Sequence, residues 1–294
     1  MSEAVLSQES DGIAAEEWRE LLARVSNDGQ LFFTENQLYL AYARNRLQVT
    51  RYIARRGVIG LFLIVVGLAA WVYALKADWG ITLVLGIFIT LSGVAMVGTG
   101  VVTRREPASR ERVNRWLSKQ VQSSPLERLI EAPRLAETSG EHQPAHVACL
   151  IIVQRKTLAD LLLLNGAHQQ LSALIVAESG YPRAHLAQAQ RLLNESSDLS
   201  VLVLHDATPE GVALAARLQK NADFPLGARK LLDVGLFPAD VQWLAELAPA
   251  IPNGYTNQVP VDSLSYRALV AGLGGVTRGA LSLVQGIEAA EANE

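Results

Sequence analysis

The sequence predicts an α/β domain with a parallel sheet and flanking helices, joined to an α-helical transmembrane hairpin. Two uncharged apolar runs, 57–75 and 80–102, lie in the first half of the chain, and three apolar, β-rich runs alternate with helical segments in the second half. Of the 294 residues, 50% are hydrophobic, and the mean hydropathy is +0.18. We therefore divide the chain into a cytoplasmic helical N-terminal region (1–56), the hairpin (57–102), a juxtamembrane helix and linker (103–146), the α/β domain (147–250) and a C-terminal helical segment (251–294).

The N-terminal region is predicted to be helical. Residues 14–25 have an amphipathic pattern with acidic residues in the first turn, where they favour a helix N-terminus. Residues 26–29 break this helix, and 37–56 have a helical pattern that can continue into the first apolar run.

The two apolar runs match the length of membrane-crossing helices, which need about 20 apolar residues. Basic residues gather outside both runs, whereas the short connector 76–79 is neutral overall. Because basic flanks stay in the cytoplasm, we expect a multi-pass protein of the inner (cytoplasmic) membrane with both termini cytoplasmic and the lipid bilayer as a partner. Neither run carries an ionisable residue, which favours an anchor over a channel.

Charge and cysteine content exclude several classes of protein. The net charge of −3 and the isoelectric point near 6.0 argue against general nucleic-acid binding, which needs basic surface, so DNA is not an expected partner. Cys149 is the one cysteine, so the chain has neither an internal disulfide nor a cysteine-based zinc cage.

The α/β domain is predicted from strands at 147–153, 171–178 and 199–206, each followed by a helical segment. Such alternation is typical of a parallel sheet, in which ligands bind beyond the carboxyl ends of the strands. No glycine-rich phosphate loop follows any of these strands. The candidate ligand-binding residues at the strand ends are Gln154, Glu178, Arg183, Asp206 and Thr208.

Four motifs occur in a fixed order along this domain: IIVQRK, LIVAESGYPRAHLAQAQRLL, VLVLHDATPEGVALAARL and LLDVGLFPADVQWL. In this order they resemble the Toprim domain of the A subunit of type VI topoisomerases and of its meiotic relatives. The resemblance implies a Toprim-like parallel sheet. In that family a glutamate and two aspartates at the strand ends bind Mg²⁺, because a hard cation needs several anionic oxygens.

The acidic residues of that family are mostly replaced here. The three positions read Gln154, Asp206 and Thr208, and Glu178 on the neighbouring strand end could supply a second carboxylate. Asp206 and Glu178 are therefore the candidate metal ligands, but we do not expect Mg²⁺ as a cofactor. Two apolar runs stand where the family has its domain with a catalytic tyrosine, so DNA cleavage is not expected.

Simpler interpretations compete with these candidates. Asp206 could cap the helix that begins near Pro209, Glu178 could be a solvent-facing acid, and Arg183 could be a surface charge. His142 and His146 are four residues apart, but Pro144 disfavours a helix there, so they are interpreted as two loop histidines.

Three functions remain open. The leading hypothesis is a membrane-anchored, non-catalytic Toprim-like protein that binds a partner protein or a nucleotide-like ligand, with the C-terminal segment packing on the domain or mediating self-association. The second is a divergent metal-dependent phosphotransfer or nuclease-type enzyme that uses Asp206 and Glu178. The third is a structural membrane protein in which the α/β domain is a spacer.

Overall fold

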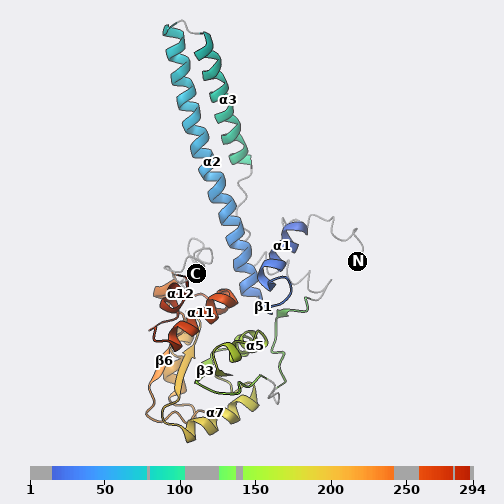
Figure 1. Cartoon of the computed structure of the whole chain (residues 1–294), viewed down its shortest axis with the longest axis vertical. Coiled ribbons are helices and arrows are strands. Elements are labelled where there is room, and N and C mark those ends of the chain that lie inside the picture. Colours follow the sequence, from blue (N-terminus) through green and yellow to red (C-terminus); the bar gives the residue numbers. More distant parts are fainter. Residues whose placement is uncertain are drawn as a thin grey trace, which may run out of the picture. The chain divides into compact units, whose positions relative to one another are not determined.

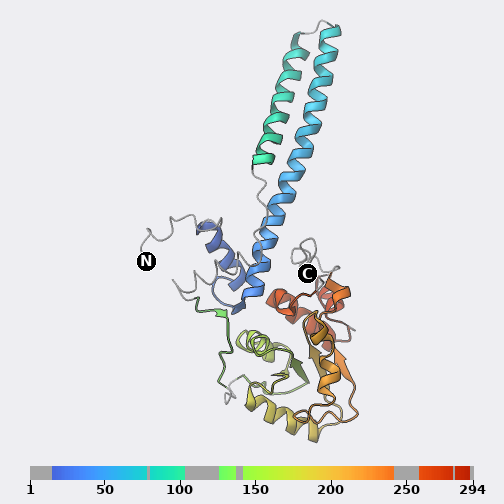
Figure 2. The same ribbon diagram turned by 180° about the vertical axis from the view of Figure 1, so that it is seen from behind.

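A computed structural model describes residues 15–77, 80–102, 126–136, 142–241, 258–280 and 282–291, and the side chains of all of these except 15, 45–57, 74–77, 80–83 and 97–102. The chain forms two compact units, Met1–Tyr42 with Arg110–Glu294, and Ala43–Ser109. Figures 1 and 2 show both units. The predicted juxtamembrane helix lies mostly outside the described residues.

The first unit is built around a four-stranded parallel sheet with the order β4-β3-β5-β6. Its central strands are apolar and buried on both faces except at the exposed Ser200, as is typical of parallel sheets covered by helices. The register places Val153, Ala177 and Leu204 side by side, so the residues that follow them begin at the same edge. The prediction of a parallel α/β sheet is confirmed. The strands are β3 (Cys149–Val153), β4 (Ala173–Ala177), β5 (Ser200–Leu204) and β6 (Leu231–Asp233).

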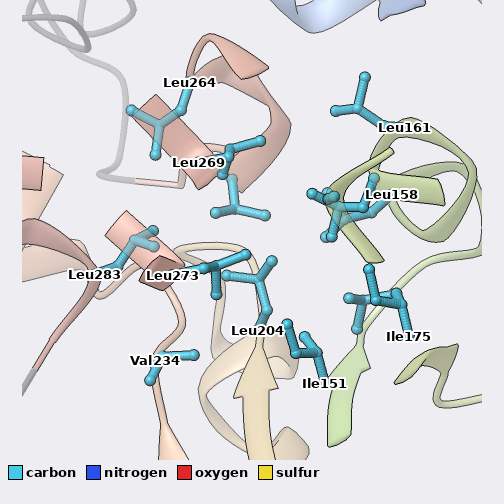
Figure 3. Packing of buried hydrophobic residues seen from close by; sticks show 14 of the residues in the cluster. Ile151, Leu158, Leu161, Ile175, Leu204, Val234, Leu264, Leu269, Leu273 and Leu283 are labelled. Atoms are coloured by element: carbon cyan, nitrogen blue, oxygen red, sulfur yellow. The ribbon is translucent and has the colours of Figure 1, made fainter. Parts of the chain in front are cut away.

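Helices cover both faces of this sheet. Alternate strand residues enter two separate hydrophobic clusters, because successive side chains of a strand point to opposite faces. Ile151, Ile175 and Leu204 pack with helices α5 (Lys156–Leu164) and α11 (Tyr266–Thr277), as Figure 3 shows. The opposite face packs against α7 (Arg183–Glu195) and α9 (Leu214–Leu218). The remaining short elements are α6 (Ala167–Gln170), α8 (Pro209–Val212), α10 (Pro238–Val241) and the 3-10 helix η3 (Val261–Ser263).

The N-terminal segment belongs to this same unit. It contributes α1 (Ala15–Ser26) and β1 (Phe33–Thr34), and β1 pairs in parallel with β2 (Leu129–Ile130). The side chain of Asn165, at the end of α5, both accepts a hydrogen bond from the Phe32 amide and donates one to the Phe32 carbonyl. These contacts fix the start of the next helix, α2 (Glu35–Ala77), beside the α/β domain.

The C-terminal segment forms two helices that cross at glycines, α11 and α12 (Leu283–Glu291). A Cβ atom on Gly286 would lie 2.2 Å from the carbonyl oxygen of Gly272, and one on Gly275 would lie 2.4 Å from the Cα of Gly286. Glycine is therefore required for the two backbones to approach this closely.

Replacing Gly286 by alanine is expected to lower the free energy of unfolding by about 1–3 kcal/mol, because the added methyl group must push the two helices apart. Urea denaturation followed by far-ultraviolet circular dichroism measures this change. Gly274→Ala in α11 is the matched control, since its new Cβ would meet mainly the flexible side chain of Arg278, at 3.3 Å. An equal loss in both variants would contradict the role of the crossing.

The second unit is an antiparallel pair made of the later part of α2 and of α3 (Gly80–Val102), which lie side by side in Figures 1 and 2. Glycines again allow close contact: a Cβ on Gly67 would lie 2.3 Å from Thr90 Oγ1, and one on Gly93 would lie 2.6 Å from the Gly60 carbonyl oxygen. The outer faces carry exposed apolar side chains such as Phe62 and Phe88.

The membrane predictions need correction. Within the part of the chain that the structure describes, no helix combines the length and the apolar character needed to cross a membrane. The predicted transmembrane hairpin at 57–102, the multi-pass inner-membrane location and the orientation derived from it are therefore wrong for the described chain.

Candidate functional site

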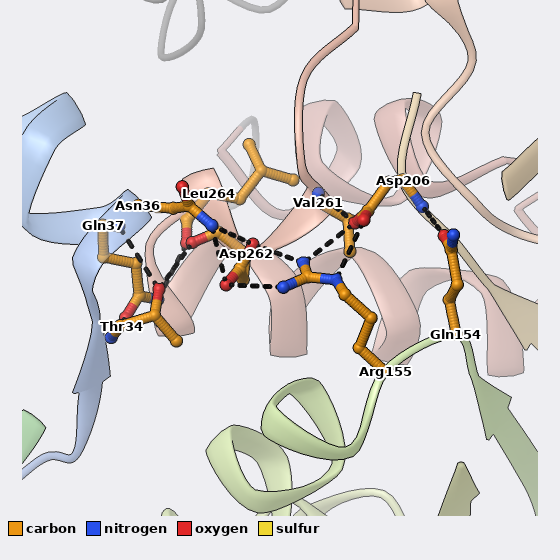
Figure 4. Close-up of polar contacts among 9 residues, drawn as sticks. All are labelled: Thr34, Asn36, Gln37, Gln154, Arg155, Asp206, Val261, Asp262 and Leu264. Atoms are coloured by element: carbon orange, nitrogen blue, oxygen red, sulfur yellow. Dashed lines mark hydrogen bonds and ion pairs between the residues drawn. The ribbon is translucent and has the colours of Figure 1, made fainter. Parts of the chain in front are cut away.

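The candidate site lies at the carboxyl edge of the sheet, where the chain leaves β3 and β5 (Figure 4). Gln154 and Arg155 follow β3, and Asp206 follows β5 two residues after its end. A third contribution comes from Asp262 in η3, which is distant in the sequence. We call Arg155, Asp206 and Asp262 the Arg155 cluster.

The guanidinium group of Arg155 lies between two carboxylates. Its Nε is 2.9 Å from Asp206 Oδ2, and its Nη2 is 3.0 Å from Asp206 Oδ1 and 2.6 Å from Asp262 Oδ1. The exposed fractions of the side chains are 31% for Arg155, 8% for Asp206 and 1% for Asp262. Burial alone would lower the pKa of Arg155, but Asp262 and Asp206 outweigh it and raise that pKa. The cluster therefore carries its own fixed cation.

Asp206 and Gln154 are also held by the backbone. The amide of Val261 donates to Asp206 Oδ1 over 2.8 Å, and the amide of Asp206 donates to Gln154 Oε1 over 2.9 Å. The side chain of Gln154 thus fixes the turn after β5. Because its amide group is uncharged, Gln154 adds no charge to the Arg155 cluster.

Asp262 links the cluster to the N-terminal segment. Asn36 Nδ2 donates to both carboxylate oxygens of Asp262, over 3.0 and 3.2 Å, and the Thr34 hydroxyl donates to the Asp262 carbonyl over 3.3 Å. Gln37 Nε2 donates to the carbonyl of Leu264 over 2.9 Å. The start of α2 is therefore joined to the sheet edge through Asp262.

Thr208 caps a helix. Its Oγ1 accepts a hydrogen bond from the Gly211 amide over 3.0 Å, at the N-terminus of α8. The capping role predicted for Asp206 therefore falls to Thr208, and the carboxylate of Asp206 is directed to Arg155. Gly211 is needed for close approach here, because a Cβ on it would lie 2.2 Å from the Asp206 carbonyl oxygen.

Glu178 is paired elsewhere. Its two carboxylate oxygens accept from Arg217 Nε and Nη2 over 2.8 and 2.9 Å, and this hydrogen bonding raises the pKa of Arg217. Arg183 begins α7 as an exposed side chain. Glu178 is thus paired with Arg217, whereas Asp206 is paired with Arg155.

The Tyr181 side chain in the same turn has a structural role. Its hydroxyl lies 2.8 Å from Asp160 Oδ1 and 2.9 Å from the carbonyl oxygen of Leu135. Tyr181 is buried, and so is Asp160 on α5. Tyr181, which belongs to the LIVAESGYPRAHLAQAQRLL motif, therefore holds this turn against α5.

His205 follows β5 and is completely buried. Its Nδ1 lies 2.8 Å from the Asp206 carbonyl oxygen and its Nε2 lies 2.9 Å from Asp233 Oδ1. Both ring nitrogens face acceptors, so the doubly protonated imidazolium satisfies both contacts. Burial alone would lower the pKa of His205, but the Asp233 hydrogen bond and the Asp206 carbonyl raise it. His205 and the Asp206 carboxylate therefore have different partners and do not form an acid–base pair.

Sequence reasoning missed two of the three cluster residues. Arg155 was visible in the IIVQRK motif as a cation directly after a predicted strand, and this was the one available signal. Asp262 lies outside the predicted domain 147–250, in a segment without a motif.

The described residues contain no group of three or more histidine, cysteine, aspartate or glutamate side chains placed to hold a metal ion. Comparison of the chain with protein-family models, with curated proteins and with solved structures finds no match.

Proposed function

We propose that this chain is a non-catalytic binding module whose α/β domain is a degenerate relative of the Toprim fold. The observation that carries the proposal is the position of the Arg155 guanidinium between the carboxylates of Asp206 and Asp262. A cation that belongs to the chain occupies the edge of the sheet where, in the family that the motifs resemble, a bound cation does the chemistry.

The other candidate ligands are engaged in contacts that support this proposal. Gln154 accepts from the backbone, Thr208 caps α8, and Glu178 pairs with Arg217. To bind here, Mg²⁺ would have to displace Arg155 from two buried acids. The metal ion and the guanidinium group are both positively charged, so Coulomb repulsion opposes the approach of the metal ion. A metal-dependent enzyme using Asp206 and Glu178 is therefore the weaker hypothesis.

A partner protein suits the sheet edge better than a nucleotide. The strand ends carry no glycine-rich phosphate loop, and the cationic group nearest them is already paired with carboxylates. Loops at the carboxyl edge, held by Tyr181 and Gln154, offer a fixed surface for such a partner.

Calorimetric titration of Mn²⁺ into the full chain tests the proposal. We expect any dissociation constant to be weaker than about 1 mM, because both acids are already paired with Arg155. Tight Mn²⁺ binding that is lost in Asp206→Asn but kept in Asp223→Asn, which changes an exposed carboxylate, would overturn the proposal in favour of the enzyme.

A further inference from the structure

Three histidines gather beside β4, away from the Arg155 cluster. The rings of His142 and His168 pack edge to face with centroids 5.5 Å apart, and His185 Nδ1 lies 2.8 Å from the carbonyl oxygen of Ile175 in β4. His168 and His185 are buried, with exposed fractions of 3% and 0%, and His142 is half-buried. They come from three places: the segment 142–148 that leads into β3, helix α6 and helix α7.

Each of these rings has a buried nitrogen that finds no hydrogen-bond partner within the described part of the chain: Nδ1 of His142, Nδ1 of His168 and Nε2 of His185. A neutral imidazole has one N–H and one lone pair. His185 Nδ1 faces a carbonyl and so carries the hydrogen, and His168 makes a hydrogen bond with the backbone of Leu163. The unpartnered nitrogens of these two rings are thus the lone-pair nitrogens, and the neutral rings are satisfied.

Protonation would break this balance. A second proton on His168 or His185 would create a buried N–H with no acceptor, beside rings that would carry the same charge. Burial is the largest cause that lowers the pKa of His168, and the nearby rings of His142 and His185 lower it further. Burial is also the largest cause that lowers the pKa of His185, and His142 lowers that pKa further. Among the residues that the structure describes, no carboxylate is named among the groups that shift either pKa.

We propose that His168 and His185, with the ring of His142 packed against His168, form an acid-sensitive latch that holds the segment 142–148 against α6 and α7 while His168 and His185 are neutral and releases it when they are protonated. His142 is the least buried ring and lies in an irregular segment, so opening begins there. The direction follows from linkage: the closed state binds protons less readily than the open state. Its stability is therefore full above the ordinary histidine pKa of about 6.5 and falls as the pH drops below that value.

Hydrogen–deuterium exchange of the full chain at pH 7.5 and 5.5, corrected for intrinsic exchange rates, tests the latch. The opening of 142–148 is expected to increase about tenfold at pH 5.5 for each histidine that stays neutral in the closed state. His168→Phe keeps an aromatic ring against His142 but cannot be protonated. The increase in this variant is therefore expected to be about tenfold smaller than in the original chain. His146→Phe, which changes an exposed histidine of the same segment, is expected to keep the full increase.

Two outcomes would overturn the latch: exchange in 142–148 that does not rise with acid, or a full acid response in His168→Phe. If His168→Phe does not fold, the ring signals of the original chain decide by nuclear magnetic resonance. His168 and His185 are expected to titrate below the ordinary histidine range, and titration within that range would reject the proposal.

Discussion

Replacing Arg155 by methionine is expected to lower the free energy of unfolding by about 3–5 kcal/mol, because it leaves two buried carboxylates without their cation. Asp206 and Asp262 would then face each other with exposed fractions of only 8% and 1%. Methionine keeps most of the length of the arginine side chain and removes the charge. Urea denaturation at neutral pH measures the difference.

Arg191→Met in α7 is the matched control for this variant. Arg191 is exposed, so its replacement is expected to change the free energy of unfolding by less than about 0.5 kcal/mol. The double variant Arg155→Met with Asp262→Asn should recover part of the loss, since one unpaired carboxylate has been removed. A single-variant loss below about 1 kcal/mol, which is typical of an exposed ion pair, would show that the Arg155 cluster does not fix the sheet edge.

Replacing Asp233 by asparagine is expected to lower the free energy of unfolding by about 1.5–3 kcal/mol at pH 6, the range for a hydrogen bond to a charged group. His205 has a raised pKa in the folded chain, mainly because Asp233 outweighs the effect of burial. Its contribution to stability is therefore full below the unfolded pKa of about 6.5 and is lost as the pH rises through the raised folded value. The difference between the original chain and the variant should shrink accordingly towards pH 9.

Denaturation curves at several pH values between 6 and 9 measure this difference. His168 and His185 are unchanged in the variant, so their own pH dependence cancels when the two chains are subtracted. Asp223→Asn, at an exposed carboxylate, should show no such pH-dependent difference. An Asp233→Asn chain with the pH dependence of the original would mean that Asp233 does not hold the charge on His205.

The strands β3, β4 and β5 could be predicted from the sequence because they are short, mostly apolar and mostly buried, and because helical segments separate them. The pattern 147–153, 171–178 and 199–206 gives β3, β4 and β5 within a few residues of their observed ends. The strand β6 was not predicted, since its side chains are partly exposed and only three residues pair. The apolar runs at 57–75 and 80–102 are helical, but the membrane location inferred from them was not supported.

The contacts of the candidate site could not be predicted from local sequence patterns, because they join residues that are far apart in the sequence. Asp262 reaches Arg155 because η3 returns to the sheet edge, and no spacing rule connects two residues so far apart. The residue that caps α8, by contrast, could have been predicted from the local sequence. Pro209 occupies the first turn of the helix, which makes the residue before it the expected N-cap. Thr208 could have been assigned that role, which would have left the Asp206 side chain free for another partner.

The Arg155 cluster also bears on the order in which the chain is synthesised. Arg155 and Asp262 are separated by 107 positions, and Asn36 and Asp262 by 226. During translation the N-terminal segment and the first strands leave the ribosome well before η3, so Arg155 meets one acid early and the other late. The α/β domain thus acquires its last counter-charge only after η3 has emerged, 107 positions after Arg155.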